Sequence, residues 1–178
     1  MTLVERIVTL HRALAKAEVP HAFGGALALA WCTERARGTI DIDINLFVDS
    51  KGFEVVEGAL PDGIEITDQD REAIAADGQV RLWWEATPVD VFCNTTPFHE
   101  AASRRVRIEP FGGADVPFLA CRDLAVFKAF SDRTKDWADL EEMHAAGTLD
   151  LPAVLGTIVE YLGAGDHCIE RLRALSSR

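Results

Sequence analysis

Basic residues are scarce in this chain of 178 residues, which carries 18 lysines and arginines against 29 aspartates and glutamates and has a formal net charge of −11. This excess of acid argues against broad neutralisation of nucleic-acid phosphates, although a local basic groove stays compatible with it. The longest apolar run, Ala22 to Cys32, is about half the length that a transmembrane helix needs. The sequence does not open with a basic segment followed by an apolar stretch, so we expect no secretory signal and a cytoplasmic protein.

Two kinds of recognisable motif are also missing. The four cysteines, Cys32, Cys93, Cys121 and Cys168, form no Cys-x-x-Cys pair, and no histidine has the spacing of a zinc ligand. We expect them to be small core thiols in a reducing compartment. No Gly-Lys-Ser/Thr follows a glycine-rich loop, which excludes the P-loop of many ATPases.

The segment from Thr39 to Phe47 alternates strictly between polar and apolar residues. A period of two predicts a β-strand, here from Gly38 to Val48, whose successive side chains point to opposite faces. One face should be buried and consist of Ile40, Ile42, Ile44, Leu46 and Val48. The other face should consist of Thr39, Asp41, Asp43 and Asn45. Since like charges on one strand face repel, we expect a cation at the two aspartates.

Two further features accompany this strand. Gly24-Gly25 forms a turn between a short predicted strand, His21–Phe23, and an apolar helix, which allows backbone N–H groups to approach a phosphate closely. Asp90 lies within an apolar segment that predicts a later strand. Three carboxylates from two strands suit two Mg²⁺ ions, with Mn²⁺ as an alternative, and such a pair of ions stabilises in-line displacement at phosphorus.

The remaining patterns predict an α+β fold. Apolar residues at helical spacing predict a first helix that ends before Val19-Pro20, and the pattern from Arg122 onward is helical with three breaks. We therefore predict a mixed β-sheet flanked by helices in residues 1–120, and a C-terminal helical bundle packed against it in residues 121–178.

The order Gly24-Gly25, Asp41-x-Asp43 and Asp90 resembles the signature of the polymerase-β-like nucleotidyltransferase superfamily. The resemblance implies the nucleotidyltransferase fold and a catalytic metal site at the three aspartates. It also implies that Asp90 activates the acceptor hydroxyl and that the two glycines contact the β- and γ-phosphates of an NTP. The superfamily usually has Gly-Ser where this chain has Gly-Gly, so a serine hydroxyl toward a phosphate is missing.

Two stretches extend the likeness to the AbiEii-like toxins and related small bacterial nucleotidyltransferases. One is Arg37-x-Thr39-x-Asp41-x-Asp43, and the other lies between Asp123 and Asp139. Together the two resemblances imply a set of nucleotide-binding residues, namely Gly24, Gly25, Arg37, Thr39, Lys128, Arg133, Lys135 and Asp136. Charges at helical spacing are also typical of a solvated helix face, and Arg37 is equally compatible with an ordinary surface arginine.

Two other groups of residues have open interpretations. Trp83 and Trp84 should point to opposite sides of a predicted strand, and we expect core packing for both, although one could stack on a base. Arg104, Arg105 and Arg107 form the densest basic patch, which indicates either an RNA-facing edge or ordinary solvated charges.

The resemblance implies an enzyme that moves an NMP from an NTP, such as ATP, to a hydroxyl or phosphate acceptor and releases pyrophosphate. A toxin-like member would modify tRNA or another RNA and would have a cognate antitoxin, whereas a resistance-like member would modify a small hydroxyl-bearing molecule. The acidity of the chain favours a small, cationic acceptor. The alternative is a non-catalytic nucleotide-binding module or regulatory partner with the same fold. We expect no membrane partner.

Overall fold

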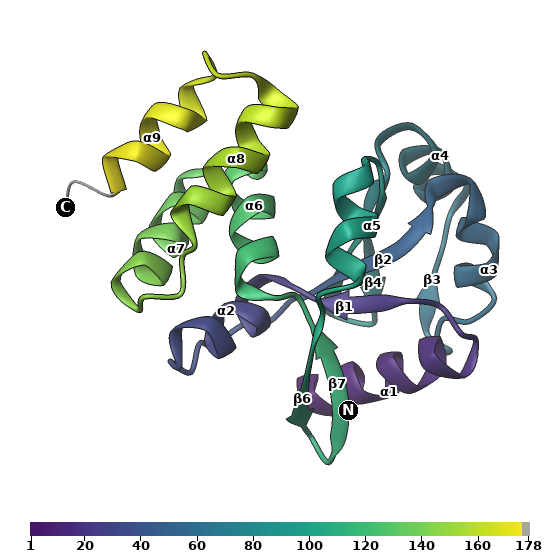
Figure 1. The fold of residues 1–178 in the computed structure, drawn as a ribbon. Helices are drawn as coiled ribbons and strands as arrows, with labels where there is room; N and C mark the ends of the chain where they lie inside the picture. Colours follow the sequence, from purple (N-terminus) through teal and green to yellow (C-terminus); the bar gives the residue numbers. More distant parts are fainter. Residues whose placement is uncertain (176–178) are drawn as a thin grey trace. The chain divides into compact units, whose positions relative to one another are not determined.

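The computed structural model describes residues 1–175 and contains a seven-stranded mixed sheet with the strand order β3-β4-β5-β2-β1-β7-β6 (Figure 1). The strands are β1 (His21–Phe23), β2 (Ile42–Asp49), β3 (Ile64–Glu65), β4 (Gln79–Trp84), β5 (Thr87–Asn94), β6 (Arg107–Phe111) and β7 (Ala114–Phe118). The helices are α1 (Leu3–Lys16), α2 (Gly25–Thr33), η1 (Ser50–Gly52), α3 (Phe53–Glu57), α4 (Asp68–Asp77), α5 (Pro97–Ser103), α6 (Cys121–Ser131), α7 (Thr134–Ala145), α8 (Leu151–Leu162) and α9 (His167–Leu175). The predicted α+β fold is confirmed.

The chain divides into two compact units. The first unit comprises residues 1–27 and 38–119 and holds the whole sheet. The second comprises residues 28–37 together with the chain from residue 120 onward, where α6 to α9 lie. Helix α2 begins in the first unit and ends in the second.

The centre of the sheet is the parallel pair β2 and β5. A parallel pair needs a long crossover, and here the chain between the two strands forms α3, β3, α4 and β4 before it returns. Strand β1 pairs antiparallel with the other edge of β2, and β4 pairs antiparallel with β5. Helix α5 packs against both central strands. The centre of the sheet is therefore held by strands β1 and β4 at its two sides and by helix α5.

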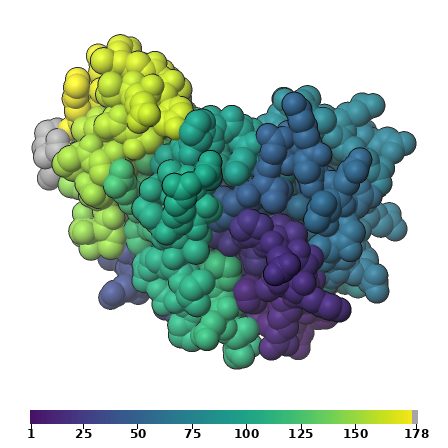
Figure 2. All heavy atoms as spheres, turned by 45° about the vertical axis from the view of Figure 1, so that its right-hand side comes forward, coloured from purple at the N-terminus to yellow at the C-terminus, as the bar shows by residue number. Residues whose placement is uncertain are grey.

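Helix α1 follows the predicted apolar pattern. A capping box between Thr2 and Glu5 begins the helix, and Ile7, Leu10 and Leu14 are fully buried. The helix packs against the β6–β7 hairpin, as the purple and green atoms of Figure 2 show. It ends before Val19-Pro20, as predicted.

The structure corrects the predicted start of strand β2. The strand begins at Ile42 rather than Gly38, and Ile40, predicted to be buried, is 80% exposed. The hydroxyl of Thr39 is engaged with Asp41, both with its backbone N–H and with its carboxylate, and this local turn replaces ladder pairing before residue 42. Ile42, Ile44 and Leu46 are buried as predicted. Val48, also predicted to be buried, is half-buried.

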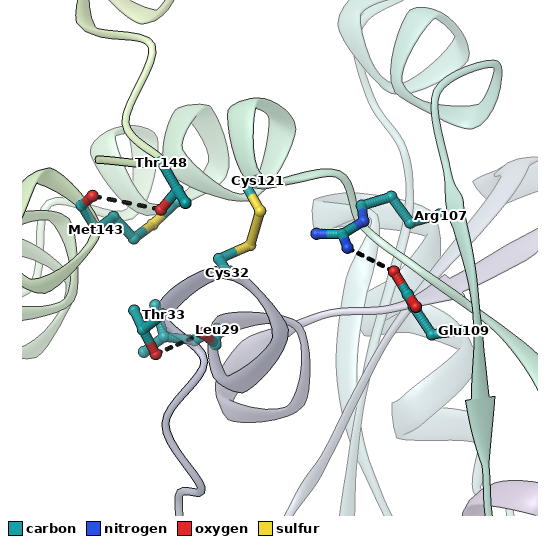
Figure 3. The surroundings of a disulfide bond; sticks show 8 residues. All are labelled: Leu29, Cys32, Thr33, Arg107, Glu109, Cys121, Met143 and Thr148. Carbon is teal, nitrogen blue, oxygen red and sulfur yellow. Dashed lines mark hydrogen bonds and ion pairs between the residues drawn. A yellow bond between two sulfur atoms is a disulfide. The ribbon is translucent and has the colours of Figure 1, made fainter. Parts of the chain in front are cut away.

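In the second unit, a disulfide joins Cys32 of α2 to Cys121 at the start of α6 (Figure 3). The prediction of separate core thiols is therefore wrong for these two residues, because their Cα atoms lie 5.6 Å apart, within the range of a disulfide. Cys93 and Cys168 are buried free thiols, as predicted. Within residues 1–175, none of the helices has the length and apolar character needed to cross a bilayer.

Candidate functional site

Asp43 and Asp90 are direct neighbours on the two central parallel strands. Their Cα atoms are partners in the pairing of β2 with β5, and both lie on half-buried positions between fully buried apolar residues. Directly opposite residues on adjacent strands point to the same side of a sheet. The structure therefore brings together two of the three carboxylates that the sequence singled out, on one face at the centre of the sheet.

The Gly24-Gly25 turn is hydrogen-bonded to β2 at Asp43. The backbone N–H of Gly24 donates to the carbonyl oxygen of Asp43 over 2.9 Å, and Gly25 is the first residue of α2. A Cβ atom at Gly25 would lie 1.8 Å from the carboxylate Oδ2 of Asp43. The helix start and the carboxylate thus share one small region. The first N–H groups of a helix have no partner within the helix and favour an anion.

Asp41 lies one residue before β2, and Thr39 orients its side chain. The Thr39 hydroxyl donates to Oδ1 of Asp41 and also accepts from the Asp41 backbone N–H over 3.3 Å. Thr39 is predicted to bind the nucleotide, and in the structure its hydroxyl is bonded to Asp41, a predicted metal ligand. The prediction is compatible with these bonds, since the same hydroxyl has further acceptor capacity.

Arg81 is a residue of this site that sequence reasoning missed. It is the Cα partner of Asp90 in the pairing of β4 with β5, so Asp43, Asp90 and Arg81 form a row across three strands. Its guanidinium donates from Nε to Oδ1 of Asp90 over 2.7 Å and from Nη2 to Oδ2 over 2.6 Å. The pKa of Arg81 is raised, first by Asp90 and further by the charges of Asp41 and Asp43.

Trp83 lies on the same face of β4 as Arg81, two residues further along. Its side chain is 53% exposed, whereas Trp84 is buried at 4%, so the prediction of core packing is confirmed for Trp84 and wrong for Trp83. Trp83 pairs with Pro88 and Glu65 on the neighbouring strands. The alternation of β4 explains the difference, because only one of two consecutive side chains can face the core.

The residue types at the three aspartates fit a divalent cation. Carboxylate oxygens are the ligands that Mg²⁺ and Mn²⁺ prefer. Both oxygens of Asp90 already accept a hydrogen bond from the guanidinium of Arg81, with which a metal ion would compete. Glycine at position 25 allows the Asp43 carboxylate to lie where the side chain of any other residue would be. The residue types at Asp41, Asp43 and Asp90 thus suit the ions that the resemblance implies, but among the described residues the ligand atoms of these three do not all lie within 4.8 Å of one another.

One ion network contains three of the predicted nucleotide-binding residues of the second unit, namely Lys128, Arg133 and Asp136. Lys128 Nζ donates to Asp139 over 2.6 Å and to Asp136 over 3.4 Å, and Arg133 Nε donates to Asp136 over 2.6 Å. Lys128, Asp136 and Asp139 are all buried, so the alternative of a solvated helix face is wrong for these three. Helix α6 thus ends in a charge cluster that is neutralised within its own unit.

Arg37 and Lys135 complete the set of predicted residues in that unit. The guanidinium of Arg37 donates to Asp139, which together with Glu142 raises the pKa of Arg37. Lys135 is exposed on the first turn of α7. Arg37 therefore belongs to the same network as Lys128, which the sequence interval of about ninety residues between them did not indicate.

Two other features lie apart from the predicted site residues. In the second unit, Asp132, His167 and Cys168 bring their ligand atoms within 4.8 Å of one another, but the Asp132 carboxylate already accepts from Trp137 and Arg171 as well as His167. In the first unit, a cavity of about 310 Å³ is lined by residues that include Val19, His21, Phe47 and Val106. None of the predicted site residues lines that cavity.

Comparison with known proteins supports the fold. The solution structure of the antibiotic-resistance factor ANT(2″)-Ia matches with a TM-score of 0.55 at 15% identity, covering 98% of this chain and 89% of that chain. The crystal structure of ANT(2″)-Ia in complex with adenylyl-2″-tobramycin matches with a TM-score of 0.56 at 15% identity, covering 100% and 99%. An antigenic nucleotidyltransferase-like protein from Paracoccidioides brasiliensis has a TM-score of 0.50 at 13% identity, covering 97% and 92%.

No family model and no curated protein sequence matches the chain. The structural neighbours therefore establish that this chain has the fold of nucleotidyltransferases, at an identity too low to carry over an activity.

Proposed function

We propose that this chain is a metal-dependent enzyme that transfers a nucleoside monophosphate from an NTP to a hydroxyl group of a small acceptor molecule. The observation that carries the proposal is the pairing of Asp43 with Asp90 on adjacent parallel strands, next to the Gly24-Gly25 turn at the start of α2. The shared fold of the nucleotidyltransferase neighbours supports the same class of reaction.

The residues of the first unit have complementary roles in this reaction. The N–H groups at the start of α2 bind phosphate oxygens of the NTP. Asp90 takes the proton of the acceptor hydroxyl while that oxygen attacks the α-phosphorus, and the bond to the bridging oxygen breaks so that pyrophosphate leaves with the electron pair. Two Mg²⁺ ions bound by Asp41, Asp43 and Asp90 would supply charge neutralisation for the triphosphate. Positioning and electrostatics then account for most of the rate.

A small, cationic acceptor fits the charge of this chain best. The net charge of −11 attracts cations and repels polyanions. Of the basic patch, Arg104 is paired with Glu100 and Arg107 with Glu109, which leaves less positive charge for an RNA backbone. One structural neighbour is a complex with adenylyl-2″-tobramycin, a product in which a small molecule carries the adenylyl group.

The AbiEii-like resemblance supplies a second set of proposals. It predicts nucleotide contacts from the second unit through Arg37, Lys128, Arg133, Lys135 and Asp136. For Lys128 such a contact would require the side chain to exchange its buried carboxylate partners, which costs more than the use of an exposed lysine. Of these two lysines, we therefore propose Lys135 rather than Lys128 as the one that contacts the nucleotide.

A labelling screen tests the proposal. Each of ATP, CTP, GTP and UTP, radiolabelled at the α-phosphate, is incubated with the protein and Mg²⁺ against a panel of aminoglycosides and against total tRNA. We expect label on a small acceptor and an equal amount of pyrophosphate. Label on tRNA would favour the RNA-modifying alternative. Binding of an NTP with no labelled product and no pyrophosphate would contradict the enzymatic proposal and support the non-catalytic module.

A further inference from the structure

Arg81 lies against the carboxylate that the proposed reaction uses as a base. Both oxygens of Asp90 accept a hydrogen bond from its guanidinium, at 2.7 and 2.6 Å. This two-pronged geometry is the strongest form of arginine–carboxylate pairing. Asp90 therefore already has a cationic partner, the side chain of Arg81, in the absence of any metal ion.

The burial of the two side chains is unequal. The Asp90 side chain is 18% exposed and the Arg81 side chain 52% exposed. The carboxylate is therefore held in place by the sheet, while the guanidinium lies at the more open end of the pair and has room to move. A move of Arg81 away from Asp90 would free the carboxylate without any change in the backbone of β4 or β5.

Arg81 also lies in the field of more than one acid. Asp43 is in the same cross-strand row, and the charges of Asp41 and Asp43 act on the guanidinium in addition to that of Asp90. An ordinary cross-strand ion pair would balance one acid with one base. Here the guanidinium of Arg81 contacts Asp90 and also lies in the field of Asp41 and Asp43, the two other predicted metal ligands.

We propose that Arg81 is a built-in counter-cation of this site, which holds Asp90 until divalent metal ions arrive and keeps metal binding weak in the absence of an NTP. The inference rests on the proposed function, and it makes Arg81 a positioning residue. Repulsion between a unit charge and a divalent ion about 6 Å apart, in a dielectric close to that of water, corresponds to about tenfold in affinity.

Titration of the NTP-free protein with Mn²⁺, followed by the EPR signal of the free ion, measures this effect. We expect Arg81→Gln to bind Mn²⁺ about tenfold more tightly than wild type, and Arg81→Lys, which keeps the charge, to stay within about threefold of wild type. Asp43→Asn should lose the binding, which assigns the ion to this site. Arg71→Gln is the matched control, because Arg71 makes a similar two-pronged pair with Glu57 in the same unit and should leave the affinity unchanged.

The outcomes separate the inference from the proposed function. Equal or weaker Mn²⁺ binding by Arg81→Gln, in a protein whose wild type transfers labelled nucleotide, would overturn the role of Arg81 alone. No Mn²⁺ binding at millimolar concentration by wild type or by Arg81→Gln, either with or without an NTP, would overturn both the metal-dependent function and the inference. Thermal unfolding shows whether each variant is folded, and Arg81→Met gives the same comparison if the glutamine variant is not.

Discussion

The backbone of Gly25 lies directly against the carboxylate of Asp43. A Cβ atom at Gly25 would be 1.8 Å from Oδ2 of Asp43, and Gly25 has a φ of +51°, in the left-handed region that favours glycine. Two independent constraints therefore require glycine here. They give a physical reason for Gly-Gly at a turn where the nucleotidyltransferase signature usually has Gly-Ser: in this conformation a serine would displace the side chain of Asp43.

Replacement of Gly25 by alanine should disturb both stability and activity. We expect Gly25→Ala to lower the free energy of unfolding by about 1–2 kcal/mol from the left-handed backbone alone, and to reduce nucleotide transfer strongly because Asp43 must move. Gly113→Ala is the matched control, since Gly113 has a φ of +79° with nothing within 4 Å of a Cβ. It should lose stability but keep transfer. Denaturant unfolding and the labelling assay measure the two effects, and full activity of Gly25→Ala would refute the role of this contact.

Loss of the Thr39 hydroxyl should slow the reaction without unfolding the protein. A hydrogen bond to a charged group is worth about 1.5–3 kcal/mol, so Thr39→Val should lower kcat/KM by about 10- to 100-fold through misorientation of Asp41. Thr39→Ser keeps the hydroxyl and should restore most of the activity. If the valine and serine variants are equally active, Thr39 has no positioning role. Steady-state kinetics of the three proteins decides the point.

Reduction of the disulfide should destabilise the second unit. The cross-link between Cys32 and Cys121 closes a loop with a sequence separation of 89, which in the chain-entropy model stabilises by about 4–5 kcal/mol and in practice by about 2–4 kcal/mol. We expect a lower melting temperature in reducing agent, and the same decrease for Cys32→Ser in the absence of reductant. Cys93→Ser is the control, because Cys93 is a buried free thiol and its replacement removes no cross-link. A melting temperature that reductant leaves unchanged would show that the bond does not stabilise the protein.

Stability should fall in mild acid because of His21. Burial lowers the pKa of this imidazole to about 4, partly offset by its bond to the carbonyl of Val19 over 2.7 Å. The unfolded chain takes up a proton below its pKa of about 6.5, whereas the folded chain does not, so this contribution is complete above that value and decreases as the pH falls toward 4. Between pH 7 and pH 5 we expect a loss of about 2 kcal/mol.

The matched variant for this pH dependence is His21→Gln. Glutamine can donate to Val19 but does not titrate, so its free energy of unfolding should vary less between pH 7 and pH 5 than that of wild type. Urea unfolding at the two pH values gives the comparison. Equal slopes in the two proteins would exclude His21 as the source.

The sequence predicted the elements of this fold well because its periodicities are strong. Alternation identified β2, helical spacing identified α1, and the turn residues separated the C-terminal helices. The prediction failed at Ile40, where a side-chain bond from Thr39 to Asp41 competes with strand pairing, and periodicity carries no information about such a competition.

Arg81 was missed although its signal is present in the chain. Strands β4 and β5 are joined by Glu85 and Ala86, and Glu85 has a φ of +55°, as in a two-residue hairpin turn. A loop of that length fixes the register, so that residue 81 pairs with residue 90. In contrast, the disulfide and the network around Lys128 depend on contacts between helices distant in the sequence, which no local pattern specifies.

The central claim is that the carboxylate pair of β2 and β5 carries out nucleotide transfer, and the single-turnover rate of Asp43→Asn tests it most directly. Asparagine keeps the shape of the side chain and removes its charge. With the NTP and acceptor found for wild type, we expect the rate to fall at least about a hundredfold, while Asp115→Asn, at an exposed acid of β7, keeps the wild-type rate. Transfer by a folded Asp43→Asn protein at the wild-type rate would contradict the account.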